Sequence, residues 1–438
     1  MVSHKNKKWK GYFLRSVIFI TGCFLGIAGC SRKDSVANSP EPSVVLPVVT
    51  AITTTPSPKP ATNIPTKTIS PTITLTLLPK HAPTQEATVT PEISPDVYQY
   101  ECLNISQTLP SDIDLKGKMV LLDAERNPYI WDTHSQTSQY LDNAWSGVEI
   151  SSDHSSILYQ TDNEVIIADV NNHVIWSRSK EGIFYANWFD NDRLLTFGNT
   201  VEDLPLLILM NPFTGEQQEL TSVFPGISKA RTILWGLTRV IYDPTQTRVV
   251  YPFFDGENKT SVALWNTETN QEIARIITYG FPAFGYEPVW FSNGERFIFV
   301  ADVTEREPGD LLFHHELLSV SREGEFQVLT HFSNFFRQTE MNGGYRLSPD
   351  ETQIAFWMDD GQGMGEGLQL AVLNMNTDQV TNYCISGAGY PIWSPDSTQL
   401  LVLTTEQEAY STILVDLDQK IAALIAEETE PQGWMLAP

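Results

Sequence analysis

The sequence lacks the local motifs that identify several classes of enzyme. It contains no Gly-x-Ser-x-Gly, and hence no nucleophile elbow, and no glycine-rich phosphate loop beside a lysine. Only two of its 8 histidines, His314 and His315, are adjacent, and neighbouring residues of a strand point to opposite faces. The acidic, glycine-rich segment 359–366 lacks the ligand spacing of a calcium loop. We therefore predict no metal and no cofactor, and we assign no catalytic residue.

Basic residues are also few: 28 Lys and Arg stand against 53 Asp and Glu, a formal net charge of −25. Residues 1–98 hold 10 of the basic and 5 of the acidic residues, so the remainder carries 18 basic and 48 acidic residues. A domain of this charge is repelled by nucleic acid and by anionic lipid, which we exclude as partners. Solubility outside the cell explains the charge, and a cationic ligand is the alternative.

The apolar run near the N-terminus is too short to span a membrane comfortably. It covers residues 17–27, which is 11 residues, where a transmembrane helix needs about 20. Basic residues precede it, and it ends in Ile27-Ala28-Gly29-Cys30, which resembles a bacterial lipobox. This resemblance implies that residues 1–29 are a lipoprotein signal peptide and that Cys30 is lipidated. An uncleaved signal anchor, with Cys30 as an ordinary thiol, is the alternative. Both place the remaining chain on the extracytoplasmic face of a bacterial cell membrane.

Aromatic residues are absent from the next segment until Tyr98. Residues 31–98 contain 12 Pro, 13 Thr and 7 Ser. Such a segment buries too little apolar surface to offset the entropy lost on ordering. We predict that residues 30–98 form a disordered linker, which its prolines keep semi-extended, and that residues 99–117 lead from it into a folded domain.

One pattern repeats through the rest of the chain. In segment 390–424, four short runs rich in β-branched and aromatic residues are separated by turn residues, which predicts four antiparallel strands. With Trp393 as its anchor, the pattern recurs at intervals of 38 to 57 residues, at Ile150, Trp188, Tyr242, Trp290 and Leu347. A second-strand residue follows each anchor by seven positions: Ile157, Leu195, Val249, Phe297, Ile354 and Leu400. A residue on the same face follows two positions later: Tyr159, Phe197, Tyr251, Phe299, Phe356 and Val402. Each third strand ends at a turn-forming residue: Asp169, Asn211, Asn266, Ser319, Asn374 and Asp416.

A seventh copy of the pattern is divided between the two ends of this region. Segments 118–123, 129–132 and 137–141 match strands two to four, and segment 433–438 matches 390–395 and would supply the first strand. We therefore predict an all-β fold, a seven-bladed β-propeller over residues 118–438. Its blades are four-stranded and antiparallel, and the C-terminal strand closes the ring, which leaves few exposed sheet edges.

Three short motifs make the chain resemble a known class of propeller. They are Trp-Ser-Pro-Asp at 393–396, Leu-Ser-Pro-Asp at 347–350 and Trp-Phe-Ser-Asn at 290–293, and they resemble the blade signature of bacterial TolB-like, WD40-related (PD40-type) β-propellers. The resemblance covers residues 118–438 and implies the fold. Members of that class mostly bind proteins or adjoin a catalytic domain, so the resemblance does not choose a role.

Only four cysteines are present, and two of them form a candidate disulfide. Cys23 leaves with the signal peptide and Cys30 is the lipidation site, so Cys102 and Cys384 remain in an oxidising compartment. A bond between them would attach the lead-in segment to the rim of the propeller. Two free buried thiols are the alternative.

The long loops of the predicted propeller share one face. Three of them, 221–239, 278–287 and 329–344, join consecutive blades and combine aromatic residues with arginine, the composition of interface anchors. The candidate binding residues are Trp235, Phe281, Phe284, Tyr286, Phe332, Phe335, Phe336 and Arg337. Packing of these side chains beneath their own loops is the alternative.

These observations predict a monomeric binding or scaffold module, anchored by lipid, that recognises a protein or envelope ligand through one propeller face. Its only contact with the membrane is the lipid. The alternative is a propeller enzyme, lyase- or lactonase-like or glycan-processing, with a site at the channel mouth that several blades assemble.

Overall fold

The structure is a computed structural model of a chain that divides into two compact units, residues 1–87 and 88–438. It describes part of the second unit: residues 98–111, 113, 115, 117–145, 147–199, 205–220, 241–254, 260–278, 287–302, 312–361, 367–404 and 410–436. The signal peptide, the lipidation site and the linker up to residue 97 lie outside these residues. Among the described residues, no helix is long and apolar enough to cross a membrane.

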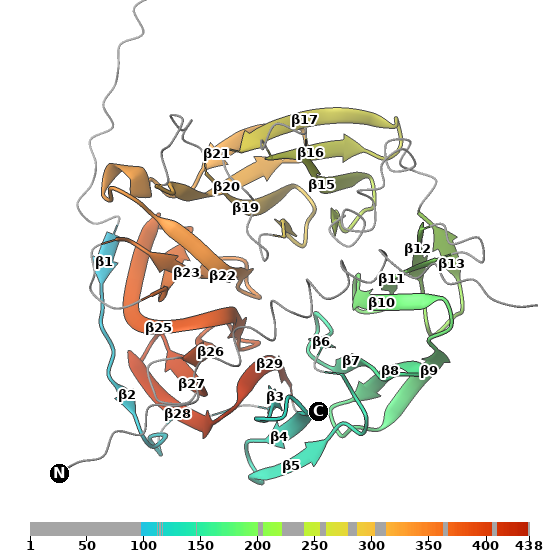
Figure 1. The fold of residues 1–438 in the computed structure, drawn as a ribbon, viewed down its shortest axis with the longest axis horizontal. Helices are drawn as coiled ribbons and strands as arrows, with labels where there is room; N and C mark the ends of the chain where they lie inside the picture. The colour runs from blue at the N-terminus through green and yellow to red at the C-terminus, as the bar shows by residue number, and fades with distance from the viewer. Residues whose placement is uncertain are drawn as a thin grey trace, which may run out of the picture. The chain divides into compact units, whose positions relative to one another are not determined.

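The described strands form five four-stranded antiparallel sheets and one nine-stranded sheet (Figure 1). We call each set of four strands a blade. Blade one is β29 (Glu430–Met435), β3 (Lys118–Leu122), β4 (Pro128–Asp132) and β5 (Thr137–Tyr140), and blade two is β6 (Val148–Ile150), β7 (Ser156–Gln160), β8 (Glu164–Asp169) and β9 (Val174–Ser179). Blade three is β10 (Ile183–Trp188), β11 (Leu194–Asn199), β12 (Pro205–Met210) and β13 (Gln217–Glu219), and blade four is β14 (Ile241–Tyr242), β15 (Arg248–Phe254), β16 (Thr260–Asn266) and β17 (Gln271–Thr278). Blade five is β18 (Val289–Trp290), β19 (Arg296–Asp302), β20 (His315–Ser321) and β21 (Phe326–Val328).

The nine-stranded sheet contains blades six and seven, which share the long strand β25. The part of β25 up to Ser386 pairs with β24, and the part from Gly387 pairs with β26. Two lead-in strands, β1 and β2, pair in parallel with β25 and β28. The strands of this sheet are β22 (Glu340–Leu347), β23 (Gln353–Asp359), β24 (Gln369–Asn374), β25 (Gln379–Trp393), β26 (Gln399–Thr404), β27 (Ser411–Asp416), β28 (Ile421–Glu427), β2 (Ile105–Ser106) and β1 (Tyr98–Tyr100); a short 3-10 helix, η3 (Phe332–Asn334), precedes β22.

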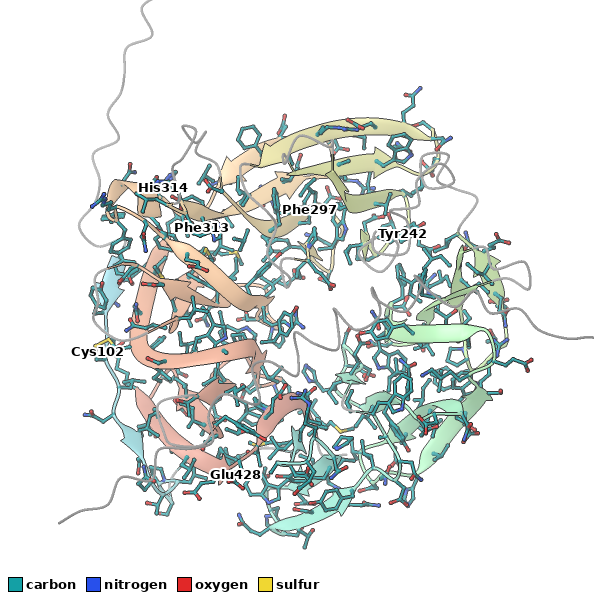
Figure 2. All side chains as sticks on the ribbon, viewed as in Figure 1. Cys102, Tyr242, Phe297, Phe313, His314 and Glu428 are labelled. Atoms are coloured by element: carbon teal, nitrogen blue, oxygen red, sulfur yellow. A yellow bond between two sulfur atoms is a disulfide. The ribbon has the colours of Figure 1, made fainter. Side chains whose placement is uncertain are left out.

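Buried apolar side chains join every blade to the next. Seven clusters lie between consecutive blades, and Phe297, labelled in Figure 2, belongs to the one between blades four and five. The last cluster joins Leu401 and Leu414 of blade seven to Met119 and Trp434 of blade one. The blades therefore form a closed ring, and the predicted all-β propeller fold is confirmed.

Polar residues at the ends of the third strands explain the turns that follow them. The side-chain oxygens of Asp169 and Asn211, for example, accept the backbone N–H two residues further on, at 2.8 and 2.9 Å. The prediction is wrong for Ser319, because β20 continues to Ser321 and Ser319 is buried in it. Ser321 is the turn residue, and its hydroxyl accepts the N–H of Glu325 at 3.1 Å.

Two predicted registers are also wrong. In blade three Trp188 lies opposite Leu194, six positions later, whereas Trp393 lies opposite Leu400, seven positions later. Because its turn is one residue shorter, Leu195 and Phe197 pack towards blade four instead of blade two.

At the C-terminus, Trp434 pairs with Met119 as Trp393 pairs with Leu400. The first strand of blade one is therefore β29, and the predicted alignment of 433–438 with 390–395 is displaced by two residues. A shift of two keeps the same side chains on the same face. Closure of the ring by the C-terminal strand is correct.

Candidate functional site

A pocket of about 400 Å³ lies where the first strands of several blades meet. Its lining comes from blades one, two, three, six and seven, which converge only at the centre of the ring (Figure 1). This volume is within the range of small-molecule sites. The lining residues are Gly147, Val148, Glu149, Leu158, Tyr159, Gln160, Tyr185, Ala186, Arg346, Gly389, Tyr390, Ile392, Leu403, Glu430, Pro431 and Gln432.

Glu149, on β6, is the carboxyl group that the neighbouring blade holds in place. Its Oε2 accepts the backbone N–H of Trp188 at 2.8 Å, and the amide of Asn187, with its oxygen and nitrogen exchanged, donates to Oε1 at 3.3 Å. Burial raises the pKa of Glu149 to about 7; the Trp188 N–H and the charge of Arg346 oppose this rise, and the charge of Glu287 adds to it. Both protonation states are therefore populated near neutral pH.

Arg346, on β22, presents its guanidinium to the same pocket. Its Cζ lies 4.0 Å from the centroid of the Tyr390 ring, a cation–π contact, and Nη1 donates to the carbonyl of Tyr345 at 3.4 Å. The Tyr390 ring occupies space that only glycine leaves free, because a Cβ on Gly344 would lie 2.3 Å from its Cδ1. Gly344 thus allows the ring to support the guanidinium, most of whose five N–H donors face no partner among the described residues.

Tyrosine rings and a glutamine complete the polar lining. Tyr185 and Tyr390 are 44% and 37% exposed, and the Tyr390 ring carries the guanidinium of Arg346. Burial and the charge of Glu149 raise the pKa of Tyr185, which keeps its hydroxyl protonated. Gln160 is 5% exposed, and within the described part of the chain its Oε1 has no hydrogen-bond partner. A buried acceptor without a donor is costly.

A second, more open cavity of about 500 Å³ lies beside the first on blades two and three. Trp145 forms part of it: its Nε1 donates to Asp162 at 3.0 Å, and the ammonium of Lys180 lies 3.0 Å from the centroid of a ring of the indole. The indole of Trp145 therefore already has both Lys180 and Asp162 as partners.

The structure corrects the predicted aromatic binding patch. Phe332 and Phe336 are only 2% and 8% exposed and belong to the core cluster between blades five and six. The ring of Tyr98, from the lead-in strand β1, covers them at centroid distances of 6.0 and 4.8 Å. For Phe332 and Phe336 the alternative of packing as core residues is therefore correct and the predicted binding role is wrong, because the lead-in segment covers them.

The other predicted binding residues have different positions. Phe335 is half-buried against the same cluster, and Arg337 is exposed. Trp235, Phe281, Phe284 and Tyr286 lie outside the described residues.

The predicted disulfide between Cys102 and Cys384 is present, with the two Cα atoms 4.8 Å apart. It joins the segment between β1 and β2 to β25, and Figure 2 shows Cys102 at the outer edge of blade six. The prediction that it attaches the lead-in to the rim is confirmed. Among the described residues, no group of three or more His, Cys, Asp and Glu is placed to hold a metal ion.

Sequence analysis missed the channel residues, although the repeat contains a signal for them. Glu149 and Arg346 stand one position before the anchors Ile150 and Leu347. Tyr185 and Tyr390 stand three positions before the anchors Trp188 and Trp393. Because side chains on a strand alternate between faces, the same two offsets in every blade indicate the residues nearest the channel.

No family model and no curated protein matches this chain. Solved structures to which it is similar include TolB from Acinetobacter baumannii, with 15% identity, 75% of this chain and 81% of that chain covered, and a TM-score of 0.38. Another is Hsv2 from Kluyveromyces lactis, with 12% identity, 72% of this chain and 96% of that chain covered, and a TM-score of 0.39. At this level of similarity no ligand or activity passes from these proteins to this chain.

Proposed function

We propose that this protein is a lipid-anchored, extracytoplasmic binding module that holds a small polar ligand of the cell envelope in its central pocket. The observation that carries the proposal is the convergence of Glu149, Tyr185, Arg346 and Tyr390 from four blades on one cavity. Charged groups and aromatic faces around a concave site are what fix the orientation of a small ligand. A closed ring supports such a site well, because each blade is held by two neighbours.

A ligand screen with matched variants tests this proposal. Thermal unfolding of the linker-free domain, residues 98–438, is measured with sugars, amines, carboxylates, amino acids and short peptides, for the native sequence, Arg346→Gln and Trp145→Ala. We expect one class to raise the melting temperature of the native domain and of Trp145→Ala, but not of Arg346→Gln. Stabilisation that is lost only in Trp145→Ala would place the site in the second cavity, and the proposed function would be wrong.

The anchor is tested separately, on the full chain in bacteria. Cys30→Ser should leave an unprocessed and unlipidated precursor, because the thiol is the acceptor of the lipid. Labelling with a radioactive fatty acid and the size of the mature chain measure both steps. Normal maturation of Cys30→Ser would contradict the lipoprotein assignment.

One observation supports an enzyme as the second candidate. Burial raises the pKa of Glu149 to about 7, and the same pocket contains an arginine and tyrosine hydroxyls. The pKa of a general acid or base is often raised in this way. In a lyase-like or glycan-processing enzyme, Glu149 would move the proton and Arg346 would stabilise developing negative charge. Consumption of a bound ligand by the native domain, abolished in Glu149→Gln with binding retained, would favour the enzyme over the binding module.

A further inference from the structure

We propose that the ligand of the central pocket is zwitterionic, an amino acid or short peptide with both termini free, whose ammonium group binds at Glu149 and whose carboxylate binds at Arg346. This inference rests on the proposed function and names the ligand class of the same site.

The ammonium side is formed by blade two and its neighbour. The carboxyl group of Glu149 is held in place by the Trp188 N–H at 2.8 Å, and the side chain of Gln160 lines the same pocket. A primary ammonium has three donors. It can therefore donate to both oxygens of the Glu149 carboxyl group, and Tyr185 of the neighbouring blade lines the same pocket.

The carboxylate side is formed by blade six. The guanidinium of Arg346 is fixed from one side by the Tyr390 ring, and its planar fork matches a carboxylate, which it binds in a bidentate way. Neither Arg346 nor Glu149 forms a salt bridge with any residue in the described part of the chain. Within the described residues, no ion pair therefore competes with a ligand for either group.

The strands that carry the two charges lie on different sides of the ring. Blades two and six are separated by blades one and seven along one arc of the ring and by blades three, four and five along the other (Figure 1). A ligand in the pocket can therefore contact both Glu149 and Arg346, which favours opposite charges on one molecule over a simple cation or anion. Of the remaining carboxylates, Glu430 is paired with Arg126 at 2.8 Å, and the charge of Glu287, whose carbonyl accepts the Tyr345 hydroxyl at 2.6 Å, acts on Glu149.

Binding should also release protons. The groups around Glu149 are Arg346 on β22, Glu287 before β18, Tyr185 on β10 and Tyr390 on β25. With a pKa of about 7, Glu149 is about half protonated at neutral pH, and an ammonium beside it favours the ionised form. We therefore expect about half a proton to be released per ligand at pH 7.

The experiment is isothermal titration of the linker-free domain with the twenty amino acids in L and D form and a set of dipeptides. Each binder is repeated in its N-acetylated and its C-amidated form. We expect a free zwitterion to bind, and either blocking group to weaken it about 10- to 100-fold, since it leaves one buried charge unpaired.

Two variants link each ligand group to its residue. In Glu149→Gln, acetylation of the ligand should no longer weaken binding, whereas amidation still should. In Arg346→Gln, amidation should no longer weaken binding, whereas acetylation still should. Proton release, measured in buffers of different ionisation enthalpy, should disappear only in Glu149→Gln.

Three other outcomes would contradict the inference. If sugars, simple amines or simple carboxylates bind in a way that Arg346→Gln abolishes while zwitterions do not, the ligand class is wrong and the proposed function stands. If blocked and free forms bind equally well, the assignment of the termini is wrong. If no compound class responds to either channel variant, both the inference and the proposed function fail.

Discussion

At Gly344 a side chain of another blade lies where a Cβ would be. The residue has φ of +96°, a conformation that favours glycine, and the Tyr390 ring fills the space beside it. Tyr390 in turn supports the guanidinium of Arg346 at 4.0 Å. The absence of a Cβ at Gly344 thus allows the Tyr390 ring to take the position in which it supports Arg346.

Gly344→Ala should therefore damage both stability and binding. We expect it to lower the free energy of unfolding by about 1–3 kcal/mol, from backbone strain and displacement of the Tyr390 ring. Gly367→Ala is the matched control, because Gly367 has nearly the same φ, +98°, and no atom within 4 Å of its Cβ position. Urea unfolding of both variants measures the difference, and equal losses would show that the ring contact is unimportant.

Glu149 gives the domain a stability that depends on pH. Its pKa is about 7 in the folded protein and 4.5 ordinarily, so between these values the folded state binds more protons than the unfolded state. Stability from this group is therefore present below pH 4.5 and is lost as pH rises towards 7.

Glu149→Gln should remove this dependence while keeping an acceptor for the Trp188 N–H. We expect the variant to gain stability relative to the native domain as pH rises from 5 to 8, measured by urea unfolding at each pH. Other titrating groups cancel in the comparison. A difference that stays constant over this range would contradict the raised pKa.

At the scale of elements, the lead-in segment changes what the outer edge of the ring exposes. β1 and β2 extend blades six and seven by parallel pairing. Tyr98 covers Phe332 and Phe336, and its hydroxyl accepts the amide of Asn382 at 2.9 Å. Residues that a loop would otherwise expose thereby become part of the core.

The Cys102–Cys384 bond should be the main attachment of this segment. It closes a loop of 282 residues, and on the chain-entropy model its loss should cost about 5–6 kcal/mol. Urea unfolding with and without reductant measures the effect, and the double variant Cys102→Ser, Cys384→Ser is the control, which reductant should not change. An oxidised protein in which both thiols react with an alkylating agent would refute the bond.

At the scale of the whole molecule, β29 joins the two ends of the propeller. It pairs with β3, and Trp434 and Met435 are 1% and 0% exposed. Deletion of residues 430–438 should bare the inner edge of β3 and open the cluster between blades seven and one. We expect loss of cooperative unfolding and aggregation instead of local fraying.

The matched control removes only residues 437 and 438 and keeps every pair of β29. Calorimetry and light scattering compare the two truncations. An unchanged melting temperature in the longer truncation would show that the ring does not depend on this strand.

Much of the fold was predictable because the repeat consists of residues that form turns and strands through local interactions. Asp169, Asn211 and their equivalents mark turns by bonding to nearby backbone N–H groups, and Ile157 or Ile354 marks a strand buried on both faces. Where local spacing changed, the prediction was wrong: one residue fewer in the turn after Trp188 sent Leu195 and Phe197 to the other face.

By itself the sequence determined the strand repeat, the division of one blade between both ends of the domain, and the Cys102–Cys384 pair. Only the tertiary structure decided what is covered and what is brought together. Phe332 is buried because Tyr98, 234 residues away in the sequence, lies on it. Glu149 and Arg346, almost 200 residues apart, line one pocket because ring closure places their strands around a common centre. The repeat marks the positions nearest the channel in each blade, but only closure of the ring decides which of those side chains share one pocket.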